Sequence, residues 1–380
     1  MTRLFLIRHA EAEGNIYRRA HGWYDGLVSP KGVRQIAALS ERFRGERIDA
    51  MYSSDLKRTV QTAGAVTRYR DLPIRTDPRL REQKLGIWED VPFGNLDYDS
   101  PEQMYNFNND PACWRVEGAE PYAELRRRMR GALTEIAARH DGGTVAVVSH
   151  GMAIRAFLAD VLAIPSKEIN RVPHGDNTAV SLLEYENGAF RTVYVNDASH
   201  LTGALSTFAR QSWWQDPGVP DPNNVRFRRL DPNKYPGTYL DFYEKTWKAV
   251  HGSLDGFQPA LYLGAAARHV AACPDALVTI VRPDGAVVGI TELDTERSKA
   301  ENAGWICLCY VEEAQRRRLL GVQLIGHAVS VFRRLGCRSV RLNVYEGNAA
   351  AIAFYEAYEF RRIGESDGVS GKLHVMEKTL

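Results

Sequence analysis

Two histidines follow short apolar runs, and an arginine precedes one of them. Arg8 and His9 come directly after the apolar residues 4–7, and His150 follows the apolar run 145–149. Each run predicts a buried strand. Because open α/β sheets bind ligands at the carboxyl ends of their strands, we expect both imidazoles to lie over one crevice. The guanidinium fork pairs well with phosphate oxygens, so the sequence predicts a phosphate group as the ligand.

Two further charged residues complete a set that suits phosphoryl transfer. Arg58 lies where a predicted strand passes into a helix, whose first turn favours anions. Glu82 lies in a loop after another predicted strand. In this arrangement His9 attacks phosphorus as the nucleophile. Arg8, Arg58 and His150 stabilise the transferring phosphoryl group. Glu82 protonates the leaving oxygen and then activates water.

A second candidate site lies in residues 305–325, where an apolar strand, a basic turn and an apolar helix follow one another. The N–H groups at the helix start, with Arg316, Arg317 and Arg318 beside them, would suit a pyrophosphate. A solvated basic turn explains these residues equally well.

The elements that would position these residues follow an alternating order up to about residue 200. Strands are expected at 3–7, 48–52, 73–77, 144–149 and 179–185, and helices at 31–44, 55–69, 121–139 and 151–163. This alternation predicts a mostly parallel sheet with helices on both faces, an αβα arrangement of three layers. Residues 90–120 lack clear periodicity, and we expect them to form a loop that shapes substrate choice.

A proline-rich segment separates this region from a second α/β pattern. Prolines stand at 217, 220, 222, 232 and 236, so residues 206–238 are predicted to be a connector. The pattern beyond it comprises helices at 239–250, 260–271, 320–335 and 348–357, with strands at 277–282, 286–293, 305–311, 338–344 and 372–378. The sequence therefore predicts an N-terminal domain (1–205) and a C-terminal mixed α/β domain (239–380).

Composition excludes several classes of partner and site. The net charge is +2, which gives no electrostatic reason for nucleic-acid or membrane binding. The five cysteines include no CxxC pair, so neither a disulfide framework nor a metal site is predicted. Cys307 and Cys309 are expected to be buried thiols on one strand face. The apolar run at the N-terminus is too short for a signal peptide, and we expect a cytoplasmic protein.

Four ordered motifs in the first region resemble those of a known family. Residues 6–15 (LIRHAEAEGN), 53–63 (SSDLKRTVQTA), 80–89 (LREQKLGIWE) and 148–151 (VSHG) are similar to blocks of the histidine phosphatase, or phosphoglycerate mutase-like, superfamily. The resemblance spans residues 2–201. It implies a small phosphorylated metabolite as substrate and no cofactor. The implied roles are His9 as nucleophile, Glu82 as proton donor, and a phosphate pocket formed by Arg8, Asn15, Arg58 and His150.

Phosphatases and mutases of this superfamily share the same pocket. The short segment between Glu82 and His150 resembles the phosphatase branch, because the cofactor-dependent mutases have a longer insertion there. Hydrolysis of a phosphomonoester is therefore the expected reaction, with a phosphoglycerate-type mutase as the alternative. Ala10 and Ala12 depart from the commonest Gly and a frequent Ser of the family.

The second region resembles the GNAT acyltransferase superfamily over residues 239–380. The resemblance is carried by Arg316 to Gly321 and by the block 348–360. It implies that acetyl-CoA binds through a backbone segment and a turn, formed by Tyr310, Val311, Arg316, Arg317, Arg318, Leu319, Leu320 and Gly321. Asn348 would line the pantetheine arm, and Tyr355 would protonate the thiolate of CoA. Glu292 is a candidate general base for the amine substrate of such an enzyme.

Two departures from the GNAT pattern concern backbone conformation. Leu319 stands where the first glycine of the turn is expected, and Glu359 replaces the glycine usual at the end of the helix. Both positions favour glycine. The sequence thus predicts a bifunctional enzyme, a phosphatase and an N-acetyltransferase whose amine acceptor it does not identify. The alternative is that the second region is a non-catalytic acyl-CoA-binding regulatory module.

Overall fold

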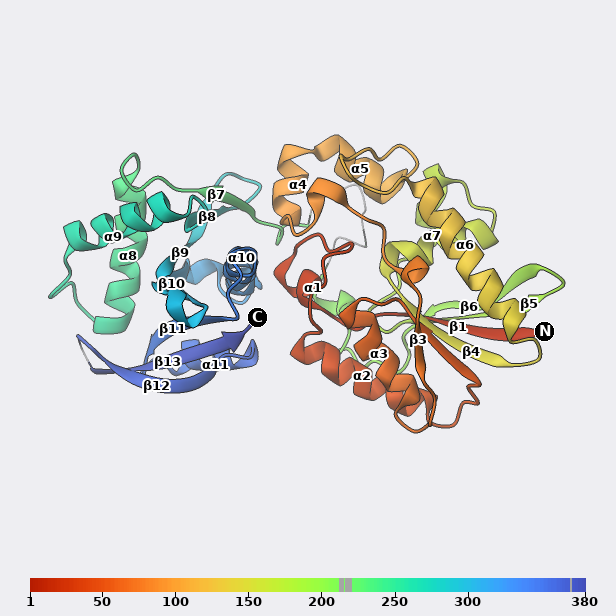
Figure 1. Cartoon of the computed structure of the whole chain (residues 1–380). Coiled ribbons are helices and arrows are strands. Elements are labelled where there is room, and N and C mark those ends of the chain that lie inside the picture. Colours follow the sequence, from red (N-terminus) through yellow and green to blue (C-terminus); the bar gives the residue numbers. More distant parts are fainter. Residues whose placement is uncertain (212–214, 216–220, 370) are drawn as a thin grey trace. The chain divides into compact units, whose positions relative to one another are not determined.

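The computed structural model describes residues 1–211, 215, 221–369 and 371–380 (Figure 1). Its chain forms two compact units, Met1–Asp221 and Pro222–Leu380. Each unit has its own sheet and its own buried core.

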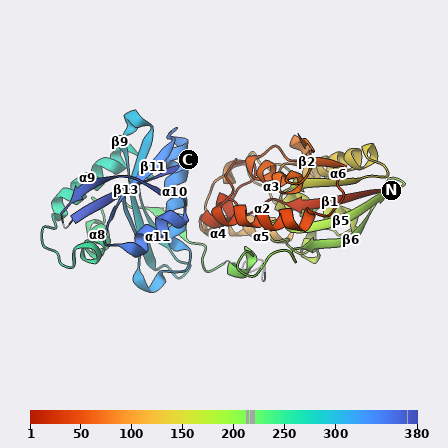
Figure 2. The same cartoon turned by 90° about the horizontal axis from the view of Figure 1, so that it is seen from below.

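The first unit is built on a six-stranded sheet with the order β3-β2-β4-β1-β5-β6. The strands are β1 (Thr2–Arg8), β2 (Ala50–Ser53), β3 (Ile74–Thr76), β4 (Thr144–Ser149), β5 (Val180–Glu186) and β6 (Ala189–Asp197). The first four run parallel to one another, and β5 and β6 form an antiparallel edge, with β1, β5 and β6 side by side in Figure 2. The sequence predicted the parallel part but did not predict β6 as a strand.

Helices cover both faces of this sheet. Side chains alternate along β1, so that Phe5 and Ile7 pack toward α2 (Pro30–Phe43) and α3 (Lys57–Thr67). Leu4 and Leu6 of β1 pack on the opposite face, toward α6 (Tyr122–Arg139) and α7 (Gly151–Val161), and β4 contributes alternate side chains to both faces. The result is the expected three-layer αβα fold (Figure 1).

Residues 90–120 contain two helices, although we expected an irregular loop. These are α4 (Phe93–Asp99) and α5 (Pro101–Asn109). They are held by a separate aromatic cluster, in which the ring of Trp114 lies 5.5 Å from that of Trp88 and 5.2 Å from that of Phe107. The helices are too short to show periodicity, and burial of these rings stabilises them instead.

The second unit contains a seven-stranded sheet with the order β12-β13-β11-β10-β9-β8-β7. The strands are β7 (Arg226–Arg229), β8 (Leu277–Val281), β9 (Val287–Ser298), β10 (Ala303–Val311), β11 (Ser339–Tyr345), β12 (Arg361–Gly368) and β13 (Gly371–Thr379). The pairings are antiparallel except for β10 with β11. This mixed sheet, with the helices that pack on it, forms the mixed α/β domain that the sequence predicted for the C-terminal region.

Four helices pack on this sheet. Helices α8 (Pro236–His251) and α9 (Pro259–Ala272) share a core with Leu308 and Ile290 of the sheet. Helix α10 (Leu320–Arg334) packs with Ile280 and Val288 in another cluster, and α11 (Ala349–Ala357) follows β11. Figure 1 shows α8 and α9 on one side of the strands and α10 on the other.

Strands β10 and β11 diverge along their length. Their parallel pairing joins residues 303–306 to residues 339–342. Beyond that point β10 continues along β9 to Val311, while β11 continues along β13 to Tyr345. The edge of β10 that faces β11 therefore presents backbone groups without strand pairing, which a ligand can use.

The segment expected to be a connector contributes to both units. Strand β7 pairs with β8 and belongs to the second sheet, which the sequence did not predict. Asp221 forms a buried ion pair of 3.0 Å with Arg18 of the first unit. Pro217 and Pro220 lie outside the described residues. The domain bounds 1–205, 206–238 and 239–380 stay a prediction.

Among the helices of the described residues, none has both the length and the apolar composition needed to cross a membrane.

Candidate functional site

His9 stands at the carboxyl end of β1, as predicted. Its backbone N–H donates to the carbonyl of Ser149 at the end of β4 (3.0 Å), which joins the ends of the two strands. Its Nδ1 lies 2.7 Å from the carbonyl oxygen of Ala10. Because that oxygen can only accept, Nδ1 carries the proton and Nε2 keeps its lone pair. The ring centroid of His150 lies 5.3 Å from that of His9.

The surroundings of His9 favour its neutral form. Burial lowers the pKa of His9 well below its ordinary value, and the positive charges of Arg58 and Arg8 lower it further. The imidazole is only 6% exposed. A neutral ring with a free Nε2 is the form that can attack an electrophile.

Arg58 lies in the first turn of α3 and is 1% exposed. Its guanidinium donates to the carbonyls of Tyr24 (2.8 Å) and Gly22 (2.7 Å). Burial lowers the pKa of Arg58 to about 10, so the group stays charged at neutral pH. Arg8 donates to the carbonyl of Gly175 (2.6 Å). Two guanidiniums therefore carry positive charge into the surroundings of His9.

Two buried nitrogen atoms beside these charges have no hydrogen-bond partner among the described residues. Nε2 of His150 lies 2.9 Å from Oγ of Ser54, while its Nδ1 is buried and has no hydrogen-bond partner among the described residues. The same holds for Nε of Arg8. Buried polar atoms are normally satisfied, so the unpaired N–H of Arg8, next to a second buried guanidinium, indicates a site for an anion.

Glu82 joins this group from the loop that follows β3, between residues 80 and 86, and its carboxylate reaches the start of α7. Its carboxylate accepts hydrogen bonds from the backbone N–H groups of Gln83 (2.9 Å), Met152 (3.0 Å) and Ala153 (2.9 Å). It thus lies at the start of the helix that His150 caps. Burial lowers the pKa of both Arg8 and Arg58, and the negative charge of Glu82 opposes that lowering in each, which places the carboxylate close to the two guanidiniums.

Several residues that position His9 were not identified from the sequence. The amide of Asn177 donates to the carbonyl of His9 (2.9 Å), and the hydroxyl of Thr62 accepts from the N–H of Ala10 (2.9 Å). Thr62 lies within the second motif block, but nothing in the sequence pointed to Asn177. Asn15 accepts from the N–H of Ala12 (3.0 Å) at the start of α1 (Glu13–Tyr17). Its contact with phosphate stays a prediction.

In the second unit, the predicted acyl-CoA residues begin at the end of β10. Tyr310 and Val311 pair with β9 on one side only. Arg316 donates from Nε to the carbonyl of Val311 (3.2 Å), and its guanidinium lies 5.5 Å from the ring centroid of Tyr310. The turn is therefore anchored to the strand, while Arg317 and Arg318 are exposed.

The residue before α10 holds a left-handed backbone conformation, which glycine adopts most readily. Leu319 precedes the helix with a φ of 60°, and no side chain caps the N–H groups that follow it, which include those of Leu320 and Gly321. A side chain at Gly321 would meet the ring of Phe354 at 3.1 Å. An uncapped helix start beside three arginines suits an anionic group.

Helix α11 carries the two other predicted residues. The side chain of Asn348 caps the helix by accepting from the N–H of Ala351 (3.1 Å). Burial and the neighbouring thiol of Cys309 raise the pKa of Tyr355 well above its ordinary value, so that its hydroxyl keeps its proton. Glu359 has a φ of 70°, and its carboxylate pairs with Lys378 (2.8 Å), which explains a charged residue at this strained position.

Glu292 is buried on β9 and has two partners. It accepts from the hydroxyl of Tyr239 (2.8 Å) and from Nδ1 of His269 (2.7 Å). Burial and the charge of Glu292 raise the pKa of Tyr239. The sequence had singled out Glu292 but neither of its partners.

Comparisons with known proteins agree with both resemblances. The model of the histidine phosphatase superfamily (branch 1) matches residues 4–198, and the model of the acetyltransferase (GNAT) family matches residues 242–360. The first match covers just over half of the chain. The protein therefore belongs to the histidine phosphatase superfamily, and it carries a GNAT acetyltransferase domain in the same chain.

Similar individual proteins match the first unit. The probable phosphoglycerate mutase GpmB of Proteus mirabilis is 31% identical over 207 residues, which span 53% of this chain and 96% of that protein. GpmB of Yersinia enterocolitica is 33% identical over 192 residues, spanning 49% and 86%. The structure of Bacillus stearothermophilus YhfR matches with 30% identity and a TM-score of 0.51, covering 53% of this chain and 99% of that one.

Proposed function

We propose that the chain is a bifunctional enzyme that hydrolyses a phosphomonoester through a phosphohistidine and transfers an acetyl group from acetyl-CoA to an amine. One observation carries the first activity. The Nδ1 proton of His9 is held by the carbonyl of Ala10, so Nε2 is free beside two buried guanidiniums and the ring of His150. The nucleophilic nitrogen of His9 therefore lies beside groups that can bind the phosphate of a substrate.

The hydrolytic reaction would proceed in two steps. Nε2 of His9 forms a bond to phosphorus while the bond from phosphorus to the leaving oxygen breaks, and Glu82 gives that oxygen a proton. Arg8 and Arg58, with His150, stabilise the charge on the other phosphate oxygens. Water then attacks phosphorus, Glu82 takes a proton from it, and inorganic phosphate leaves as His9 returns to its free form.

Trapping the covalent intermediate tests this proposal. The full-length protein is mixed with a phosphomonoester labelled in its phosphate and quenched without acid, because a phosphorus–nitrogen bond of this kind is labile in acid. We expect label on the wild-type protein and none on His9→Ala. Label that persists in His9→Ala, or phosphate release by His9→Ala at the wild-type rate, would contradict a phosphohistidine at His9.

A phosphoglycerate-type mutase is the second candidate for this unit. It is favoured by the two relatives described as probable phosphoglycerate mutases, which match over 96% and 86% of their own lengths. The short segment between Glu82 and His150 favours the phosphatase. Release of inorganic phosphate, measured in parallel with interconversion of phosphoglycerates, separates the two reactions.

The acetyl-transfer activity is supported by the turn before α10. Domains of the GNAT family generally use acetyl-CoA, and the uncapped helix start with Arg316, Arg317 and Arg318 suits its pyrophosphate. The amine nitrogen would attack the thioester carbonyl and lose a proton to Glu292. Tyr355 would give its proton to the sulfur that leaves, which requires a phenol that stays protonated.

An acyl-CoA-binding regulatory module is the alternative for this unit. It is favoured by Leu319 and Glu359, which hold left-handed backbone conformations without being glycine. Calorimetry with acetyl-CoA, combined with an assay for free thiol over a panel of amines, separates the alternatives. Binding of acetyl-CoA with release of its free thiol supports the transferase. Binding without thiol release in the presence of any amine of the panel supports the regulatory module.

A further inference from the structure

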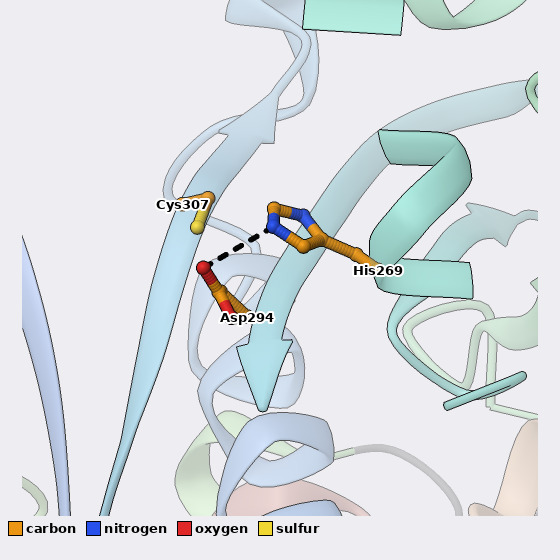
Figure 3. A group of neighbouring side chains, drawn as sticks. All are labelled: His269, Asp294 and Cys307. Atoms are coloured by element: carbon orange, nitrogen blue, oxygen red, sulfur yellow. Dashed lines mark ion pairs between the residues drawn. The ribbon is translucent and has the colours of Figure 1, made fainter. Parts of the chain in front are cut away.

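Three potential metal ligands meet in the second unit, outside the proposed acyl-CoA turn. They are His269 of α9, Asp294 of β9 and Cys307 of β10 (Figure 3). One ligand atom from each lies within 4.8 Å of the others. Nε2 of His269 is 3.2 Å from Oδ2 of Asp294. In a tetrahedral zinc site the bonds are about 2.0–2.3 Å long, so small side-chain movements would bring the three atoms around one ion.

The protonation of His269 makes this cluster unusual. Its Nδ1 lies 2.7 Å from a carboxylate oxygen of Glu292, which can only accept, so Nδ1 donates. The lone pair of Nε2 would then face an oxygen of Asp294, and two acceptors at this distance require a cation between them. That cation is either a proton on His269 or a metal ion.

The surrounding residues fix these side chains in place. Oδ1 of Asp294 accepts from the N–H groups of Glu296 (2.9 Å) and Arg297 (3.0 Å), so that Oδ2 is the atom directed at His269. Glu292 is in turn held by the hydroxyl of Tyr239 (2.8 Å). A carboxylate that accepts the second ring N–H is the usual outer partner of a metal-binding histidine.

A β-bulge brings Cys307 into this group. Ile306 pairs with Leu293 and Leu308 pairs with Glu292, so Cys307 is an extra residue on β10 with no partner residue on β9. Bulges redirect side chains. The thiol of Cys307 lies against His269, whereas Cys309 packs in the cluster formed with α10. The expectation that both cysteines are buried on one strand face is therefore wrong, and Cys307 is exposed.

We propose that His269, Asp294 and Cys307 bind a divalent transition metal of the zinc class, with Glu292 as the outer partner of His269. Nitrogen, oxygen and thiolate donors together suit Zn²⁺ better than Mg²⁺ or Ca²⁺. Three protein ligands leave a fourth position open for water or a small ligand. The proposal does not depend on either proposed activity, because it concerns binding of the ion alone.

Cobalt(II) provides the direct test, because bonding to a thiolate gives it a charge-transfer absorption band. The full-length protein is stripped with a chelator and titrated with Co²⁺, and Zn²⁺ uptake is measured against a chromophoric competitor. We expect one equivalent of metal and a thiolate band that Zn²⁺ displaces. Cys307→Ser should lose the band, His269→Ala should lose stoichiometric binding, and Glu292→Gln should weaken affinity by about 10–100-fold.

Matched variants complete the test. Two control variants, Cys273→Ser and Glu296→Gln, change a cysteine and a glutamate that are not part of the proposed site. Both should still bind one equivalent of metal and show the full cobalt–thiolate absorption band. Circular dichroism of each variant checks that it is folded. Absence of stoichiometric uptake by the wild type would overturn the proposal and leave His269 as a protonated link between two carboxylates. Uptake that survives in folded His269→Ala and Cys307→Ser would also overturn it, because the ion would then lie elsewhere.

Discussion

The two units each surround a histidine with charged groups, but the charges have opposite signs. Burial lowers the pKa of His9, and the nearby guanidiniums of Arg58 and Arg8 lower it further. His269 lies between the carboxylates of Glu292 and Asp294, and its hydrogen bond to Glu292 raises its pKa. The first environment favours a neutral ring and an anionic ligand. The second favours a cation, either a proton or a metal ion.

The difference arises from where the folds place their charges. In the first unit, positive charge is brought together at the carboxyl ends of parallel strands and at helix starts. In the second unit, the carboxylates lie within β9, next to α9 and to the bulge of β10. A histidine thus takes its chemical role from neighbours that other elements supply.

The largest effect is expected from replacing His9, which should nearly abolish the activity of the first unit and leave that of the second unit intact. His9→Ala should reduce phosphomonoester hydrolysis by about 10³-fold or more, because the nucleophile is removed. Acetyl transfer should be unchanged. Both rates are measured on the same preparation. Arg68→Ala, which changes an exposed residue at the end of α3, is the control. Equal loss of both activities would show that the units do not act independently.

The stability of the first unit should depend on Asp221, the residue at which this unit ends. Arg18 and Asp221 form a buried pair with side chains 4% and 0% exposed. Asp221→Ala should lower the free energy of unfolding by about 3 kcal/mol, because it removes one partner of a buried ion pair. Glu168→Ala breaks an exposed pair with Arg171 and should cost about 0.5 kcal/mol or less. Denaturant unfolding measures both, and similar values would argue against a structural role for Asp221.

Titration of the buried histidines tests the charge environment of the first unit directly. His9 and His150 have pKa values lowered well below 6.5 by burial and by neighbouring positive charge. Both should therefore stay neutral in the folded protein at pH 6.5, whereas the urea-unfolded protein titrates around that value. Stability linked to these groups is present above pH 6.5 and is lost as the pH falls below it. Nitrogen-15 NMR of the imidazoles measures the titration, and a folded-state midpoint at or above 6.5 would refute the assignment.

The smallest expected effect concerns the acyl-CoA turn. Leu319 holds a left-handed conformation that glycine adopts without strain. Leu319→Gly should strengthen acetyl-CoA binding by about fivefold, because loss of the side chain lets the diphosphate approach the backbone more closely. Leu335→Gly, at the other end of α10, should leave the affinity unchanged. Weaker binding by Leu319→Gly would indicate that the leucine side chain contacts the ligand.

Much of the fold was predictable because its elements have strong local patterns. The apolar runs of β1 and β4 and the helical spacing of α2, α6 and α10 gave element positions within a few residues. Local pattern was weak in α4 and α5, which form around Trp114 and Phe107. Strand β7 was hidden within a proline-rich segment, because its pairing with β8 is a long-range contact.

The sequence by itself determined the family membership and the residue types of the phosphate site. His9, Arg8, Arg58, Glu82 and His150 stand at fixed places relative to predicted strands and helices, and ordered motifs carry that information. Tertiary structure decided the tautomer of His9, because the Ala10 carbonyl fixes it. It also brought His269, Asp294 and Cys307 together from three elements, through a bulge that no spacing of cysteines indicates. Side-chain contacts between distant segments depend on packing and register, and a linear pattern does not record them.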